Sequence, residues 1–166
     1  MSLVGEIDRE IRMGVITVSD TRTKESDKGG RLVMDYVSGM NVEIKPEWYS
    51  IVKDDQQEIV DAVHELLDNG ADAIITTGGT GIAPRDVTIE AVRPLFDKEI
   101  EGFGEIFRML SFTEDIGSRS ILSRAIAGSI GNAVVLSLPG STGAVKLAME
   151  RLIVPELNHI VHELNK

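Results

Sequence analysis

The sequence predicts an α/β protein: a three-layer α/β/α domain with a mostly parallel sheet and one antiparallel edge strand. Two observations lead to this fold class. Apolar β-branched runs alternate along the chain with segments whose apolar residues recur at helical spacing, and this alternation is typical of a parallel sheet with helices on both faces. Towards the C-terminus, two apolar runs flank Gly131-Asn132, a turn sequence that indicates a hairpin and therefore an antiparallel edge.

The first half of the chain supplies two strands and two helices. The first strand is expected at 12–18, a run rich in valine and isoleucine. Apolar residues at helical spacing predict a helix over 32–37, after a glycine pair. The segment 42–52 carries alternating apolar residues and is interpreted as the second strand. A helix from Gln56 follows, and Asn69-Gly70 is expected to end it.

The second half begins with a β-branched run over 72–77, which is expected to be the central strand. Thr88 is expected to cap a short helix, and another helix is predicted around 106–110. The hairpin strands are expected within 125–138. A long helix then closes the chain, and Pro155 predicts a kink or a break in it.

The composition limits the partners that the chain can bind. Twenty-seven acidic residues against seventeen lysines and arginines give a net charge of −10. We therefore expect no nucleic-acid partner and no membrane partner, because attraction to phosphate dominates both kinds of binding. Cysteine is absent, which excludes disulfides and thiolate metal sites. No apolar run is long enough to span a bilayer and no signal-peptide pattern opens the sequence, so we expect a cytoplasmic protein.

The length of 166 residues suits one domain of ordinary size. Residues 1–10 are mostly polar and are interpreted as a mobile arm. Residues 11–166 show no internal repeat, linker or low-complexity tract, so they are expected to form the single domain.

The feature that most directly predicts a function is the glycine-rich segment after the central strand. Thr77 is followed by Gly78, Gly79, Thr80 and Gly81. Glycines at the carboxyl end of a parallel strand allow backbone N–H groups to approach a phosphate, and the threonine hydroxyls add donors. The spacing matches neither the P-loop nor the dinucleotide-binding fingerprint. On this segment alone, a phosphate-binding loop and a simple turn into a helix are about equally favoured.

Acidic residues follow two of the predicted strands. Asp86 lies a few residues after the glycines, beside Arg85, and Asp54-Asp55 ends the segment 42–52. Carboxylates in such loops can bind a divalent cation, since hard cations prefer oxygen ligands. The structural alternatives are support of a helix N-terminus by Asp86 and N-capping of the following helix by Asp54 or Asp55.

Two further loops lie at the carboxyl ends of strands. Ser19-Asp20 follows the first strand and opens a long polar loop. This loop is interpreted either as a solvated connection or, because Lys24 and Lys28 follow Asp20, as a flap over an anionic ligand. Pro139-Gly140-Ser141 follows the last strand. Lys146, one turn into the final helix, either reaches back to an anion or is simply solvated. Because parallel strands end on one edge of a sheet, these loops should surround one crevice, which suits a phosphate-bearing substrate bridged by Mg²⁺.

With these residues assembled, the sequence resembles the MoaB/Mog family of molybdenum cofactor biosynthesis, the molybdopterin adenylyltransferases. The matching pieces span nearly the whole chain in order. They are Val15-Ile16-Thr17-Val18-Ser19-Asp20, Asp27-Lys28-Gly29-Gly30, Thr77-Gly78-Gly79-Thr80-Gly81 with Arg85-Asp86-Val87-Thr88 and Glu90-Ala91, Gly102-Phe103-Gly104-Glu105, Ser120-Ile121-Leu122-Ser123-Arg124-Ala125, and Leu138-Pro139-Gly140-Ser141.

The resemblance implies an enzyme that transfers AMP from ATP to the phosphate of molybdopterin and releases pyrophosphate. It implies that Asp54 and Asp86 are the catalytic acids and hold Mg²⁺, with Asp55 as the alternative to Asp54 if the alignment shifts by one residue. The binding set that it implies, for molybdopterin or the nucleotide, comprises Ser19, Asp20, Thr77, Gly78, Gly79, Thr80, Gly81, Pro139, Gly140, Ser141 and Lys146.

The resemblance also implies self-association as a trimer or a hexamer, and hand-over of the product to a molybdenum insertase. The last loop, from Gly140 to Ala144, resembles the MoaB branch more than the Mog branch. Members of the MoaB branch need not all catalyse adenylylation. The alternative function is therefore a non-catalytic oligomer that binds or carries molybdopterin, in a pathway for molybdenum or for tungsten.

Overall fold

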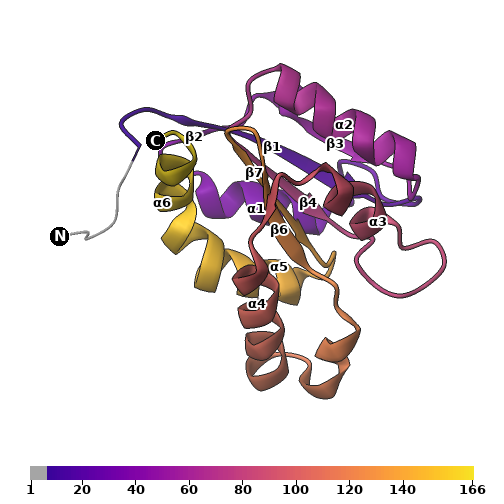
Figure 1. Cartoon of the computed structure of the whole chain (residues 1–166). Helices are drawn as coiled ribbons and strands as arrows, with labels where there is room; N and C mark the ends of the chain where they lie inside the picture. Colours follow the sequence, from indigo (N-terminus) through magenta and orange to yellow (C-terminus); the bar gives the residue numbers. More distant parts are fainter. Residues whose placement is uncertain (1–6) are drawn as a thin grey trace.

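The computed structural model describes residues 7–166 and contains one twisted sheet between two layers of helices (Figure 1). The order of strands across the sheet is β2-β1-β4-β7-β6-β5, and β3 pairs with the other half of β1 beyond β2. The strands are β1 (Ile11–Val18), β2 (Val42–Glu43), β3 (Tyr49–Val52), β4 (Ala73–Thr77), β5 (Lys98–Glu99), β6 (Ile126–Ile130) and β7 (Ala133–Leu138).

The middle of the sheet is parallel. β1 pairs in parallel with β2, β3 and β4, and β4 pairs in parallel with β7. The predicted hairpin is present: β6 runs antiparallel to β7 around Gly131, whose φ is +58°. The two-residue strand β5 pairs antiparallel with β6 and lies outside it at the edge. The predicted fold class is confirmed, and the carboxyl ends of β1, β3, β4 and β7 share one edge of the sheet.

Helices cover both faces of the sheet because successive strand residues point to opposite sides. Val15 and Ile75 belong to one buried cluster, whereas their neighbours Ile16 and Ile74 belong to the other. Figure 1 shows α2 and α3 on one face and α1, α5 and α6 on the other. The helices are α1 (Lys28–Val37), α2 (Gln56–Asp68), α3 (Thr88–Val92), α4 (Glu101–Glu114), α5 (Thr142–Ala148) and α6 (Val154–Leu164).

The segment predicted as one strand over 42–52 is wrong in detail. It forms β2, then a 3₁₀ turn over Pro46–Trp48, and then β3. Pro46 has no N–H to donate to a sheet, and its fixed φ suits the first position of a helical turn. Trp48, 8% exposed, packs into the cluster beneath α2.

The predicted interruption near Pro155 takes the form of a π-helical segment, Met149–Ile153, between α5 and α6. Pro155 cannot donate to the carbonyl four residues before it. The N–H of Val154 donates to Met149, five residues back, so the helix continues through the widened turn.

The predicted cap at Thr88 is also wrong. Val87 occupies the N-cap position of α3, and no side chain caps that helix. The Thr88 hydroxyl instead donates to the carbonyl of Gly78 at 2.9 Å. Its role is therefore to fix the glycine-rich loop rather than to begin the helix.

The expected arm over 1–10 falls partly outside the described residues, which begin at Ile7. Arg9 donates from both terminal nitrogens to the Asp72 carboxylate, at 2.7 and 2.8 Å. This pair lies at the edge of the sheet opposite the predicted site, since Asp72 immediately precedes β4. Within residues 7–166, none of the helices is both long and apolar enough to cross a bilayer.

Candidate functional site

The carboxyl ends of four neighbouring strands form one rim, as the sequence predicts. The N–H of Ser19 donates to Val52 at 2.8 Å, which joins the end of β1 to the end of β3. The N–H of Gly78 donates to Leu138 at 2.9 Å, which joins the glycine-rich loop to the end of β7. The predicted loops therefore meet at the crevice edge where ligands of open α/β sheets bind.

The glycine-rich loop, residues 78–81, is held so that its carbonyl groups are already occupied. Gly78 and Gly79 have φ of +95° and +70°, in the region that favours glycine. A side chain at Gly78 would place its Cβ 2.4 Å from the carbonyl oxygen of Val18. Thr88 donates to both carbonyls, through its hydroxyl to Gly78 and through its N–H, at 3.1 Å, to Gly79.

Arg124 holds the remaining carbonyls of the loop. Its backbone N–H donates to Thr80 at 3.2 Å. Its guanidinium donates to Gly81 at 2.7 and 3.0 Å and to the carbonyl of Asp86 at 3.2 Å. Glu90 on α3 accepts from the same guanidinium, so the cation is neutralised locally. Arg124 is thus a clamp on the loop, a role that the sequence did not reveal.

The backbone N–H groups of the same loop differ from its carbonyl groups. Within residues 7–166, the backbone N–H groups of Gly79, Thr80 and Gly81 donate to no protein acceptor. Successive N–H groups exposed in a glycine-rich turn make a concave site for an anion. The structure therefore favours the phosphate-binding interpretation of this segment over the simple turn.

The acidic residues of the rim influence one another electrostatically. The N–H of Asp54 donates to the Asp20 carboxylate at 3.0 Å. Partial burial raises the pKa of Asp54 above its usual value, the charges of Asp20 and Asp86 raise it further, and Arg85 opposes them. A cation placed among these carboxylates would relieve their repulsion.

The structure separates the roles of the two neighbouring acids, Asp54 and Asp55. Asp55 is the N-cap of α2, where its carboxylate accepts from the N–H of Glu58 at 2.9 Å. Asp54 lies one residue before the cap. The capping alternative is therefore met by Asp55, which leaves the Asp54 carboxylate free for another role.

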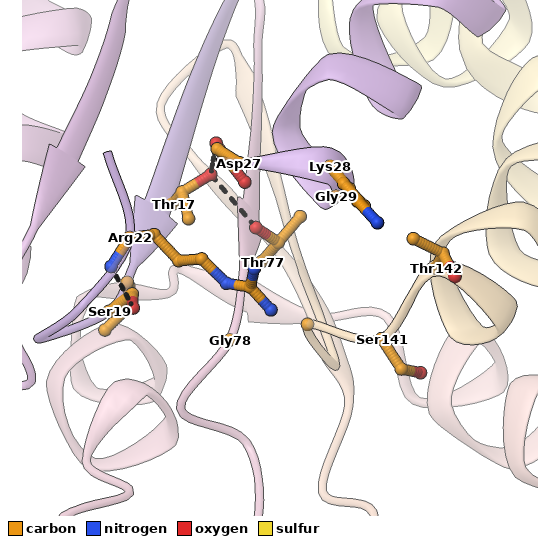
Figure 2. A pocket seen from close by; sticks show the side chains of 12 residues that line it. Thr17, Ser19, Arg22, Asp27, Lys28, Gly29, Thr77, Gly78, Ser141 and Thr142 are labelled. Atoms are coloured by element: carbon orange, nitrogen blue, oxygen red, sulfur yellow. Dashed lines mark hydrogen bonds between the residues drawn. The ribbon is translucent and has the colours of Figure 1, made fainter. Parts of the chain in front are cut away.

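Two cavities flank the glycine-rich loop, and both are lined by Gly140 and Ser141. The first, called cavity 1, has a volume of about 500 Å³ (Figure 2). Predicted residues Ser19, Thr77 and Gly78 line it. Lys28, a residue of the loop interpreted as a flap over an anionic ligand, also lines it. The sequence did not assign a site role to its other lining residues, which are Thr17, Val18, Arg22, Asp27, Gly29 and Thr142.

The second, called cavity 2, has a volume of about 310 Å³. The predicted residues Gly79, Thr80, Gly81, Asp86 and Pro139 line it. Its other walls come mainly from α4 and the segment 115–123 that follows it, and they include Phe107, Ile116 and Leu122. The Ser123 hydroxyl in this wall is buried and has no hydrogen-bond partner among the described residues. An unpartnered buried hydroxyl favours a ligand that supplies the missing bond.

Three predicted residues lie apart from the two cavities. The described residues that line the two cavities do not include Asp20, Asp54 or Lys146. Asp20 and Asp54 lie together at the rim. Lys146 is exposed and lines a separate hollow with Glu114, Glu150 and Arg151. The structure thus does not bring Lys146 to the cavities.

The acids at the rim fit a metal only in company with a substrate. Within residues 7–166, no group of three or more acidic or histidine side chains is arranged to hold a metal ion. Mg²⁺ is usually bound by one or two carboxylates together with substrate phosphates and water. Asp86 lines cavity 2 with Gly79, Thr80 and Gly81, and its charge contributes to the raised pKa of Asp54. These two carboxylates suit a metal that is also bound by the substrate phosphates.

Comparison with known proteins identifies the family. Residues 14–159 match the family described as "Probable molybdopterin binding domain". The chain is 63% identical to molybdenum cofactor biosynthesis protein B of Staphylococcus carnosus (strain TM300), over 97% of this chain and 95% of that protein.

Solved structures agree with this match. A crystal structure of molybdenum cofactor biosynthesis protein B is 52% identical, with a TM-score of 0.91, over 96% of this chain and 99% of that one. The tungsten cofactor synthesizing protein MoaB from Pyrococcus furiosus is 42% identical, with a TM-score of 0.85, over 96% of this chain and all of that one (100%). The chain therefore belongs to the MoaB/Mog family, whose members share the probable molybdopterin binding domain.

Proposed function

We propose that this protein acts in molybdenum cofactor biosynthesis as a molybdopterin adenylyltransferase, which transfers AMP from Mg-ATP to the phosphate of molybdopterin and releases pyrophosphate. The observation that carries this proposal is the arrangement of the two cavities. They share Gly140 and Ser141, and the glycine-rich loop separates them, with Gly78 in cavity 1 and residues 79–81 in cavity 2. Two ligands in these cavities would bring their phosphate groups together at the loop.

Adenylyl transfer requires two polyanions to approach in line against their mutual repulsion. The free N–H groups of Gly79, Thr80 and Gly81 would stabilise negative charge at the meeting point, and the clamp by Arg124 keeps them oriented before the substrates arrive. Mg²⁺, held by Asp54 and Asp86 with the phosphates, would neutralise further charge. Asp86 lies in the wall of cavity 2, and Asp54 lies at the rim beside Asp20.

The experiment that tests this function measures pyrophosphate release from molybdopterin and Mg-ATP. Asp54→Asn and Asp86→Asn should abolish release, because each removes one negative charge from the proposed metal site. Asp55→Asn is the matched control, since it changes the neighbouring acid to another good N-cap residue and should leave release nearly unchanged. Release that survives both Asp54→Asn and Asp86→Asn would contradict the roles proposed for these acids.

The same assay distinguishes the alternative function. A protein that binds molybdopterin and ATP but releases no pyrophosphate would be a carrier of the MoaB branch rather than a transferase. Binding would then be measured separately, by titration of each substrate. Hand-over to a molybdenum insertase and a cytoplasmic location remain proposals that follow from the family.

Self-association as a trimer or a hexamer also belongs to the proposal, and an exposed apolar surface supports it. On α4, Ile106, Met109 and Phe112 are 49%, 65% and 55% exposed, and Ile121 in the following 3₁₀ segment is 78% exposed. Large exposed apolar patches mark interaction surfaces. We propose that a second copy of this chain covers this face. Met109→Lys should shift the sedimentation of the assembly towards the monomer, and unchanged sedimentation would contradict this assignment.

A further inference from the structure

Cavity 1 has a floor of three buried polar side chains. Asp27, Thr17 and Thr77 are 2%, 5% and 1% exposed, and all three line the cavity. Figure 2 shows them as one hydrogen-bonded chain, with Thr17 between the other two. Buried polar groups that line a cavity fix the orientation of whatever binds there.

The directions of the hydrogen bonds in this chain can be assigned. Asp27 accepts from the Thr17 hydroxyl at 2.6 Å, from the Tyr49 hydroxyl at 2.5 Å and from the N–H of Gly30 at 3.0 Å. Burial raises the pKa of Tyr49 above its usual value, and the hydrogen bond to Asp27 adds to the rise, so the tyrosine keeps its proton and donates. Three donors therefore converge on the Asp27 carboxylate, which can only accept.

This fixes the polarity of Thr77. A hydroxyl group has a single hydrogen, and Thr17 uses its hydrogen on Asp27. The hydroxyls of Thr17 and Thr77 lie 3.2 Å apart, so Thr77 must be the donor of the hydrogen bond between them. With its hydrogen used in this way, Thr77 offers only lone pairs to the cavity. The sequence interpretation of the Thr77 hydroxyl as a donor to phosphate is thus reversed.

The entrance of the same cavity carries the opposite polarity. Arg22 and Lys28 line it, and Figure 2 shows the Arg22 side chain extending across the cavity and the Lys28 amine lying on the side of Thr142. Cations at the entrance favour an anionic group there, whereas a floor of acceptors repels one.

We propose that the floor of cavity 1 is a site for the hydrogen-bond-donating edge of a phosphorylated ligand, a pair of hydroxyl or amino groups, with the phosphate directed outwards to Arg22 and Lys28. A ribose diol and the amino edge of a pterin share this chemistry. The choice of these two ligands rests on the proposed function. The requirement for a hydrogen-bond donor rests on the polarity of the floor. Thr77 is then a residue that determines specificity, and it selects against phosphate at the floor.

The test uses Thr77→Val, which keeps the β-branched shape but removes the lone pairs, and Thr77→Ser, which keeps the hydroxyl. Titrations would use AMP, its 2′,3′-dideoxy analogue, 6-hydroxymethylpterin and inorganic pyrophosphate as probes. A ligand donor left without an acceptor costs about 1.4 kcal/mol or more, or roughly tenfold in affinity. We expect Thr77→Val to weaken one donor-bearing probe about tenfold, and Thr77→Ser to restore that affinity, while pyrophosphate changes less than about twofold.

The probes identify the source of the donors. Loss of affinity for AMP but not for its dideoxy analogue assigns the floor to the ribose, and loss for the pterin assigns it to the pterin. Equal weakening of pyrophosphate, no weakening of any probe by Thr77→Val, or no binding of a donor-bearing probe to the wild-type protein would each overturn the inference. Melting temperatures of the variants would show that the fold is intact. If the probes behave as expected but no pyrophosphate is released from both substrates, the floor is confirmed and adenylyl transfer is not.

Discussion

The guanidinium of Arg124 donates to the carbonyl oxygen of Gly81 twice, from Nε at 3.0 Å and from Nη2 at 2.7 Å. The residue begins the approach to β6, whereas Gly81 follows β4, so the contact joins segments 43 residues apart. Arg124 and Thr88 together occupy the carbonyls of Gly78, Gly79, Thr80 and Gly81, whereas among residues 7–166 the N–H groups of Gly79, Thr80 and Gly81 donate to no protein acceptor. The anion site that we propose would therefore be formed before any ligand arrives, as electrostatic catalysis requires.

Replacement of Arg124 by glutamine should destabilise the protein more than replacement of Glu90 by glutamine. Arg124→Gln leaves the carbonyls of Gly81 and Asp86 without their charged donor, which costs about 1–3 kcal/mol. Glu90→Gln loses only a partly exposed ion pair, and such pairs are worth about 0–1 kcal/mol. Urea unfolding of both variants measures the difference. Equal losses would show that the ion pair, rather than the bonds to the loop, dominates the contribution of Arg124.

Asp54 is expected to lower the stability of the free protein at neutral pH. Burial first, and then Asp20 and Asp86, raise the pKa of Asp54 in the folded state. Its contribution to stability is therefore fully present below the unfolded-state pKa, about 3.9, and is lost as the pH rises through the higher folded-state pKa. Asp54→Asn should raise the urea midpoint at pH 7, and the gain should shrink as the pH falls towards 4. A lower midpoint at pH 7 would contradict the repulsion.

The sequence predicts the rim well because strand ends are local signals. A β-branched run followed by glycine marks the end of β4, and parallel pairing of β1, β3, β4 and β7 then brings the loops together. The floor of cavity 1 could not be predicted in this way. Asp27 resembles any N-cap residue in the sequence, and only the folded chain places it against Thr17 and Tyr49.

Three other outcomes show what local patterns leave out. The apolar alternation of 42–52 predicts one strand. The pattern does not show that Pro46, which lacks an N–H group, begins a 3₁₀ turn that divides this strand. Lys146 follows a strand-end loop, but the direction of α5 turns its side chain to the hollow that contains Glu150. Arg124 gave no signal as a clamp, because its partners are backbone carbonyls, which any sequence provides.

The ion pair between Arg9 and Asp72 should anchor the segment before β1 to the sheet and so stabilise the folded protein. Burial alone would raise the pKa of Asp72, but the hydrogen bonds from Arg9 and from the N–H of Arg12 lower it overall. The stability that this carboxylate contributes is therefore present above its unfolded-state pKa and is lost as the pH falls through the lower folded-state pKa. Arg9→Gln leaves Asp72, 5% exposed, with fewer donors. We expect a loss of about 1–3 kcal/mol at pH 7 by urea unfolding.

The matched control for this change is Arg93→Gln, which removes an ion pair with Glu99 on the exposed edge. Its effect should be within about 1 kcal/mol. If Arg9→Gln is no more destabilising than Arg93→Gln, the Arg9 pair does not anchor the chain before β1.

The two tyrosines should resist ionisation together. The hydrogen bond to Glu150 and burial raise the pKa of Tyr36 to about 12. Burial and the bond to Asp27 raise that of Tyr49 as well. Because the chain has two tyrosines, absorbance at alkaline pH should show no tyrosinate at about pH 10, where free tyrosine titrates. Tyr36→Phe isolates Tyr49 in the same titration. A Tyr49 that titrates near pH 10 would contradict the donor assigned to Asp27.

The most direct test of the proposed reaction is to mix wild-type protein with molybdopterin and Mg-ATP and to measure the stoichiometry of the reaction by ³¹P NMR. The proposal predicts one pyrophosphate for each molybdopterin consumed, together with the signals of a new phosphoanhydride between AMP and molybdopterin. Neither substrate alone should give pyrophosphate. Unchanged ATP in the presence of folded protein and both substrates, or pyrophosphate without the new anhydride, would contradict adenylyl transfer.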